Sequence, residues 1–473
     1  MRIHRVLTPA LLVSTMIAAS AFAQPPASDH ETQEAADTLY LVPSSSLPAV
    51  ASAPPLRIPS ERTQTPGIAL VGLTMPEEIG RSARELPGPT WRLPQLEQMA
   101  MENNPAIAAA LARIEAARGH RWQAGLRPNP NFGYLANDVG EAGQAGRQGV
   151  FVGNRFITGH KLQYAQAVAD QQVLVAEQEW AVWTQRVLTD VRLGYYDVLI
   201  AQRRVEVTEE LTQVSEATAK IAGDLVAAME TSRIDVLQAQ VEWESNKIRV
   251  QKARNAHVAA WRRLSAVLGI SHLEMRRLEG DIDLAKQIVS WEDSLAKVHR
   301  DSPELAVAHA DLQRAQSEMA RALAQRVPDV TVQASVQHND AADETISGLQ
   351  VGVPLMIFDR NQGAIAKADA EITAAQRNIE QVERDLERRL ATVYRRYADS
   401  RFEVDKYVND IRPRAKESLE LASRAYRAGE TGYLVMLTSQ RTYFQTDLAY
   451  IEALHNLWQA TLQIEGLLLN TPN

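Results

Sequence analysis

Ten histidines are the side chains of this sequence best suited to bind a metal ion or transfer a proton, and they are scattered along it. No two of them form a His-x-x-x-His pair, and none lies with carboxylates at the spacing of metal ligands. The chain has no cysteine, which excludes a thiol nucleophile, a cysteine-ligated zinc site and a disulfide framework. We therefore predict no catalytic residue, no metal site and no cofactor, and expect that the protein is not an enzyme.

One run of polar residues could be mistaken for a binding site: Asp359-Arg360-Asn361-Gln362-Gly363. Phosphate-binding loops with lysine and nucleophile elbows are missing from the sequence, so this run has no catalytic motif beside it. It lies between a stretch that alternates apolar and polar residues and a long proline-poor stretch. We interpret it as a strand-to-helix motif, in which Asn361 or Asp359 is the helix N-cap.

The N-terminal part of the chain differs in composition from the rest. Arg2 and Arg5 precede an apolar segment, and Ala21-Phe22-Ala23 is a small-x-small cleavage signal, so we predict a signal peptide over residues 1–23. An uncleaved anchor helix is the alternative. More than half of the 21 prolines lie in the following segment, which is also rich in Ala and Ser. We predict a disordered extension over residues 24–91.

The remaining sequence contains an internal repeat. Asn103-Asn104-Pro105 recurs as Asp301-Ser302-Pro303, and Thr231–Leu237 aligns with Thr431–Leu437, each about 200 residues later. We therefore predict two copies of one unit, at 92–285 and 290–470. Each copy includes a proline-poor helical stretch of about 65 residues, which would be roughly 100 Å long. In the second copy a heptad seam runs from Leu386 to Ala415, and we expect Pro413 to kink or break that helix.

Each copy also contains two short stretches that alternate apolar and polar residues. They lie at about 131–139 and 148–157 in the first copy, and at about 329–338 and 347–357 in the second. Their lengths suit tilted membrane-spanning β-strands, although water-facing hairpins would alternate in the same way. Four strands cannot close a barrel and open edges are forbidden in lipid, so membrane strands would require several chains. Three copies would supply 12 strands, with an outer face that includes Val330, Val332, Val336, Leu349, Val351 and Val353.

In its order of motifs the sequence resembles the TolC-type outer membrane factors, over about residues 92 to 470. The similarity rests on the repeat, on Asn104-Pro105 and Pro128-Asn129-Pro130, and on the runs Val353–Gly363, Tyr426–Glu430 and Ile234–Ala239. The run Phe358–Gly363 is most similar to the CzcC/CusC-like heavy-metal branch. This resemblance implies a mainly α protomer of long coiled-coil helices, with four β-strands that contribute to a trimeric 12-stranded barrel.

The same resemblance implies a function. The protein would be the outer membrane channel of a tripartite efflux system, with its tunnel extending into the periplasm of a Gram-negative-type bacterium, and would passively export heavy-metal cations. Its implied partners are two further copies, a periplasmic adaptor, an inner-membrane pump of the RND type and outer membrane lipid. The formal charge of −8 argues against a nucleic-acid partner. A multidrug or type I secretion duct is the alternative cargo class, and a periplasmic coiled-coil scaffold is the alternative class of protein.

The resemblance also places the periplasmic tips, where helix pairs reverse, contact the adaptor and gate the entrance. The tip residues would be Met229, Glu230, Thr231, Ser232, Arg233, Asp235, Gly429, Glu430, Thr431, Gly432 and Tyr433. Gly429 and Gly432 permit the positive φ that such a reversal needs. Three features depart from the family pattern: Met229 replaces a frequent glycine, Val435 and Thr438 replace acidic residues, and a lipid anchor on an N-terminal cysteine is impossible.

Overall fold

The computed structural model describes residues 90–140, 146–227, 229, 232–282 and 289–469. The chain divides into two units, residues 1–75 and 76–473, and all described residues belong to the second. The predicted signal peptide and the predicted extension, apart from Thr90 and Trp91, lie outside the described residues. The second unit is mainly helical with one small sheet, which confirms the predicted fold class.

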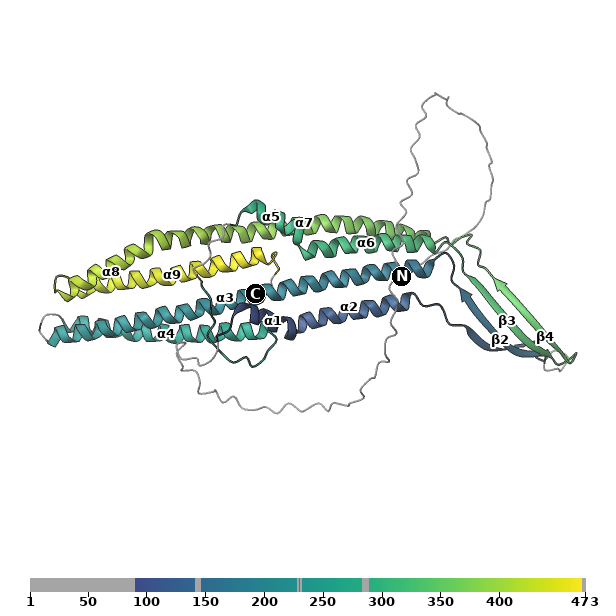
Figure 1. The fold of residues 1–473 in the computed structure, drawn as a ribbon, viewed down its shortest axis with the longest axis horizontal. Coiled ribbons are helices and arrows are strands. Elements are labelled where there is room, and N and C mark those ends of the chain that lie inside the picture. The colour runs from purple at the N-terminus through teal and green to yellow at the C-terminus, as the bar shows by residue number, and fades with distance from the viewer. Residues whose placement is uncertain (1–89, 141–145, 228, 230–231, 283–288, 470–473) are drawn as a thin grey trace, which may run out of the picture. The chain divides into compact units, whose positions relative to one another are not determined.

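The elements follow one another in the same order in both halves of this unit (Figure 1). The first half consists of α1 (Leu93–Asn103), α2 (Pro105–Ala124), β1 (Asn131–Asn137), β2 (Arg147–Phe156), α3 (Lys161–Ala227) and α4 (Arg233–Val267). The second half consists of α5 (Trp291–Asp301), α6 (Pro303–Ala324), β3 (Val330–Asn339), β4 (Glu344–Gly352), α7 (Gln362–Lys406), η3 (Tyr407–Ile411), α8 (Arg412–Arg427) and α9 (Tyr433–Glu465).

Backbone conformations at the turns also repeat between the two halves. Left-handed residues occur in pairs about 200 positions apart, at His160 and Asn361 and again at Met229 and Gly429. The first pair precedes the long helices α3 and α7, and the second lies where the helices reverse. The two halves therefore turn the chain at equivalent points, although only one of these four residues is glycine.

Pro413 coincides with a local change of the helix rather than with its end. The residues from α7 to α8 are continuously helical, and the π-helix η3 ends just before Pro413. A proline ring displaces the carbonyl four residues before it, and a π-turn accommodates such a defect without ending the helix. The ribbon bends between α7 and α8 in Figure 1.

The four strands form one antiparallel sheet in the order β1-β2-β3-β4. The β2–β3 pair joins the two halves, and its register places Val150 opposite Val336. On β4, Val351 lies opposite Val332 and Leu349 opposite Ala334, so five of the six predicted outer positions share one face. β4 ends at Gly352, not near residue 357 as predicted, because Pro354 has no N–H to donate to the ladder. Val353 therefore lies beyond the strand.

Long helices pack side by side in each half. α3 contacts α2, α4, α6 and α9, while α7 contacts α6 and α9, and α8 contacts α9. Of the predicted seam, Leu386, Leu390 and Tyr397 are buried, whereas Val408 and Ile411 near the π-helix are exposed. Among the described residues, no helix is both long enough and apolar enough to cross a membrane.

Candidate functional site

The helix reversals lie at the end of the unit opposite the sheet (Figure 1). The first joins α3 to α4 and contains Met229, with φ of 60° and an exposed fraction of 94%. Ser232 caps α4, because its side chain accepts a hydrogen bond from the Ile234 N–H at 3.2 Å. Arg233 is the first residue of α4 and Asp235 lies in its first turn. Glu230 and Thr231 lie outside the described residues.

The second reversal joins α8 to α9 through a Schellman motif. Gly429 has φ of 74°, and the Glu430 N–H donates to the Ala425 carbonyl at 2.9 Å. Gly432 does not adopt the positive φ expected of it: it is the N-cap residue of α9, with an extended backbone and φ of −73°. Met229 and Gly429 thus occupy equivalent left-handed positions, but Gly429 has no Cβ to crowd the backbone, whereas Met229 does.

Tyr433, which the resemblance places among the adaptor-contact and gate residues of the tip, is buried within this chain. It packs edge-on against Tyr426 with ring centroids 5.9 Å apart, in a cluster that unites both reversals. Burial, together with nearby Glu242, raises the pKa of Tyr433 to about 12. Burial and Asp235 also raise the pKa of Tyr426. The cluster consists of Ala222, Ala239, Tyr426, Tyr433, Met436 and Leu437.

Besides Met229, the tips expose apolar side chains of which sequence reasoning had placed only Val435 at the tip. Ile234 and Leu237 are exposed on α4, and Leu434 and Val435 on α9. Exposure of large apolar residues next to a tight reversal is typical of a protein–protein contact. Their positions in the first turns of α4 and α9 could have indicated exposure from the sequence. In a tight reversal, the partner helix of the same hairpin packs against only one side of such a turn.

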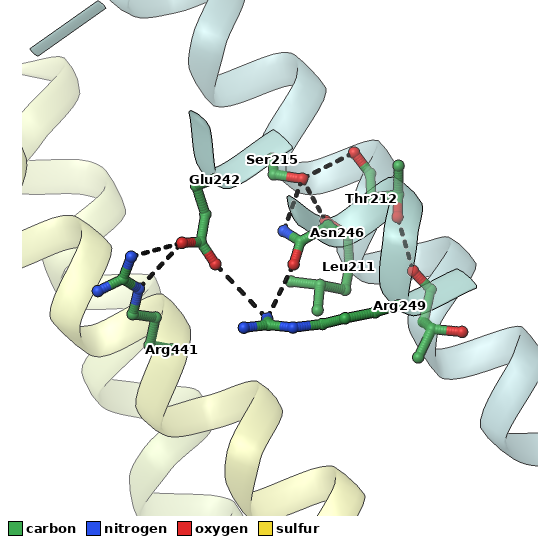
Figure 2. Close-up of polar contacts among 8 residues, drawn as sticks. Leu211, Thr212, Ser215, Glu242, Asn246, Arg249 and Arg441 are labelled. Atoms are coloured by element: carbon green, nitrogen blue, oxygen red, sulfur yellow. Dashed lines mark hydrogen bonds and ion pairs between the residues drawn. The ribbon is translucent and has the colours of Figure 1, made fainter. Parts of the chain in front are cut away.

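A buried polar network lies between the tips and the sheet and connects α3, α4 and α9 (Figure 2). Glu242 of α4, with an exposed fraction of 5%, accepts hydrogen bonds from Arg441 of α9 at 3.1 and 2.5 Å. Its other carboxylate oxygen lies 3.5 Å from Nη1 of Arg249. Figure 2 shows both guanidinium groups converging on this carboxylate from different helices. A buried carboxylate is thus neutralised from two sides.

The same network continues into α3. Arg249 Nη1 donates to Asn246 Oδ1 at 2.8 Å, and Asn246 Nδ2 donates to Ser215 Oγ at 3.0 Å. Ser215 Oγ in turn donates to the carbonyls of Leu211 and Thr212. Sequence reasoning missed this network, although Glu242 and Asn246 follow Ala239 at the three- and four-residue spacing of a buried helix seam.

The motif at Asp359–Gly363 positions helices. Asn361 stands at the N-cap of α7 with φ of 60°, but its side chain does not cap that helix. Its Nδ2 donates to the Ala322 carbonyl near the end of α6 at 2.7 Å, while Asp359 Oδ1 accepts from the Asn361 N–H at 2.9 Å. The left-handed backbone directs this side chain away from the first turn of α7, which is why the predicted cap is not formed.

Potential metal ligands do not gather anywhere in the part of the chain that the structure describes, since no three His, Asp or Glu side chains converge there. The polar chemistry of the described residues lies in ion pairs between helices. The arrangement offers an exposed apolar sheet face at one end, helical reversals at the other, and a buried network that links the halves.

Comparison with known proteins gives consistent results. The sequence profile of the family described as "Outer membrane efflux protein" matches residues 96–270 and 295–468. The chain is 26% identical over 385 residues to the cobalt-zinc-cadmium resistance protein CzcC of Cupriavidus metallidurans, which covers 81% of this chain and 91% of that protein. It is 24% identical to the nickel-cobalt-cadmium resistance protein NccC of Alcaligenes xylosoxydans xylosoxydans, over 61% and 66% of the two chains.

The fold is similar to that of CusC, whose crystal structures describe transmembrane channel formation. The TM-score is 0.66 at 14% identity, and the match covers 85% of this chain and 99% of CusC. At this identity the similarity concerns the fold alone.

Proposed function

Because this chain belongs to the outer membrane efflux protein family, as its motifs predicted, we propose that it is the duct of a tripartite system that exports heavy-metal cations. The observation that carries the cargo assignment is the identity with CzcC across 91% of that protein. In this proposal an inner-membrane pump of the RND type drives transport, and this chain performs no catalysis.

The sheet supports the membrane part of this proposal. Its apolar face is exposed, with 74% of both Phe132 and Leu349 accessible, whereas the opposite face carries Gln333, Gln337 and Gln350. One apolar and one polar face over strands of 7 to 10 residues fit lipid on one side and a water-filled lumen on the other. We propose that the apolar face contacts outer membrane lipid.

A homotrimer is the assembly that this sheet favours. Among the described strands, the outer edges of β1 and β4 have no neighbour, and lipid does not tolerate an open edge. If β4 of one copy pairs with β1 of the next, three copies close a 12-stranded barrel. The helical tunnel would then reach into the periplasm, where the exposed tips would meet the adaptor, and no lipid on cysteine would be required.

Export of metals can be tested in a strain that lacks this chain. We expect the deletion to lower tolerance to cobalt, zinc and cadmium several-fold, and expression of the wild-type chain to restore it. A panel of organic antibiotics measured on the same cells is the matched comparison. Unchanged metal tolerance together with raised drug sensitivity would replace the metal duct by a multidrug duct. Recovery of the chain as a soluble periplasmic monomer would reject the duct altogether.

A further inference from the structure

A cavity of about 620 Å³ lies between the sheet and the helices of the first half. The β1–β2 ladder begins at Asn131 and Gly153, whereas the β2–β3 ladder extends as far as Phe156. Pro128 and Pro130 precede β1 and have no N–H with which to continue its ladder. The last three residues of β2 therefore have a strand partner on one side only, and the cavity lies beside them, where α2 ends and α3 begins.

The side chains around this cavity carry an excess of positive charge. Among the described residues that line it there is no Asp or Glu, but there are Arg127, Arg155, His160 and Lys161. One carboxylate of the second half lies close by: Asp329 Oδ1 accepts a hydrogen bond from Lys161 Nζ at 2.7 Å, and its Oδ2 lies 3.8 Å from Arg155 Nε. Lys161 is buried and neutralised by this pair. Arg127 has no ion-pair partner in the described part of the chain, so the cavity favours an anion.

Two further residues connect the cavity to the apolar face of the sheet. Asn154 and Phe156 both line it, and the alternation of β2 places them on the same face as Val152. Phe156 is 52% exposed. The Oδ1 atom of Asn154 is buried and has no hydrogen-bond partner among the described residues. A buried acceptor of this kind requires a donor, and a ligand in the cavity can supply one.

The surface next to the cavity has the character of a membrane–water interface. Trp122 and Leu126, near the end of α2, are 74% and 46% exposed. Tryptophan is enriched where a membrane meets water, since its ring is apolar and its N–H is polar. Arg127 follows Leu126 directly, so a basic side chain stands beside an exposed apolar one. The cavity therefore lies at the level where the head groups of a membrane around the sheet would be.

We propose that this cavity binds the head group of an anionic phospholipid, with its phosphate at the guanidinium groups of Arg127 and Arg155 and its acyl chains along the apolar face of the sheet. Arginine suits this role, because its N–H groups match the oxygens of a phosphate. Phosphatidylglycerol fits the remaining feature, since a hydroxyl of its glycerol head group can donate to Asn154 Oδ1. The site rests on the proposed contact between the sheet and outer membrane lipid.

Native mass spectrometry of the full-length protein in a non-ionic detergent tests this site. The protein is titrated with phosphatidylglycerol or with phosphatidylcholine, and the lipids retained per chain are counted at each concentration. We expect about one phosphatidylglycerol per chain, bound about tenfold more tightly than phosphatidylcholine, because each arginine close to an anionic lipid contributes up to about fivefold. Arg127→Gln and Arg155→Gln should each lower the affinity for phosphatidylglycerol about fivefold. Arg127→Lys should lower it less, since it keeps the charge.

Arg326→Gln is the matched control. Arg326 lies at the corresponding turn after α6, is exposed, and does not line the cavity. This turn of the second half lacks the excess of positive charge, because Gln362 takes the place of Lys161 and Asp359 adds a carboxylate. The control variant removes one positive charge at the same level of the chain and should leave the binding of phosphatidylglycerol unchanged.

Equal affinity for the two lipids would overturn the site, as would an equal loss of binding in Arg127→Gln and Arg326→Gln. Inorganic phosphate is titrated in parallel, and retention of phosphate without a preference for phosphatidylglycerol would show a site for a free anion instead. Conductance of the same preparations in planar bilayers is recorded separately. Pores without the lipid preference would overturn the site and leave the duct in place. If no pore forms, the duct function fails, whereas the lipid titration still decides whether the cavity binds phosphatidylglycerol.

Discussion

Met229 adopts a backbone conformation that residues other than glycine rarely adopt. Its φ of 60° matches the φ of 74° at Gly429, although Met229 carries a Cβ that crowds the neighbouring carbonyl oxygen. The side chain is almost fully exposed and gains nothing from packing within the described residues. Strain retained at an exposed position suggests a role for the side chain, and in the proposed duct that role is contact with the adaptor.

We predict that Met229→Gly stabilises the first reversal by about 1 kcal/mol, because the left-handed strain disappears. Gly429→Ala should destabilise the second reversal by about the same amount, since no neighbouring atom restricts the added methyl group and only the strain remains. Amide hydrogen exchange at the ends of α3 and α8 measures both changes. Equal exchange in all three proteins would show that left-handed strain does not determine the stability of the tips.

Strands β1 to β4 place residues of opposite character on the two faces of the sheet. Leu349 and Gln350 are adjacent in β4, but they point to opposite faces and pair with Ala334 and Gln333 respectively. They form a matched pair for testing which face contacts lipid. Both residues are exposed in the single chain, so burial within the chain does not complicate the comparison.

Leu349→Arg should destabilise the membrane-inserted barrel by about 2 to 4 kcal/mol, because it places a charge in the hydrocarbon core. Gln350→Arg should have a much smaller effect, since the proposed lumen is wet. The amount of heat-modifiable oligomer in the outer membrane fraction measures both. If the two variants assemble equally well, or if Gln350→Arg is the worse one, the assignment of the lipid face is wrong.

At the scale of the whole molecule, the two outer helices near the tips, α4 and α8, expose apolar residues at matching heights. Leu237 lies one turn into α4, and Leu421 lies within two turns of the end of α8. Both are exposed, at similar distances from the tips. In a closed ring of copies, α4 of one chain would meet α8 of the next, while β1 would meet β4 at the opposite end.

A chain with both Leu237→Cys and Leu421→Cys should therefore form disulfides between copies under mild oxidation. Denaturing electrophoresis should show covalent dimers and trimers that disappear on reduction. Each single variant is the control and should give fewer linked species, because two copies of the same edge do not face each other in a ring. Linked species from the single variants alone would contradict this arrangement.

The sequence by itself determined the features that depend on local pattern. Alternation in the segments around Val332 and Val351 indicated strands, and the repeated landmarks indicated two equivalent halves. Proline-poor stretches indicated the long helices, since a helix interior excludes proline for local steric reasons. The repeat and the motifs along it, from Asn104-Pro105 to Tyr426–Glu430, indicated the family together, because their order is itself a linear property.

Tertiary structure decided which side chains meet. Tyr433 was placed among the tip residues but packs into the cluster with Tyr426, because helices from both halves converge there. Asn361 or Asp359 was predicted to cap α7, but the Asn361 side chain instead bonds to the end of α6. Glu242 was not singled out in the sequence, and the structure places Arg441 beside it, 199 residues further along the chain. No local pattern encodes such a pair, because its energy depends on burial by helices that are distant in the chain.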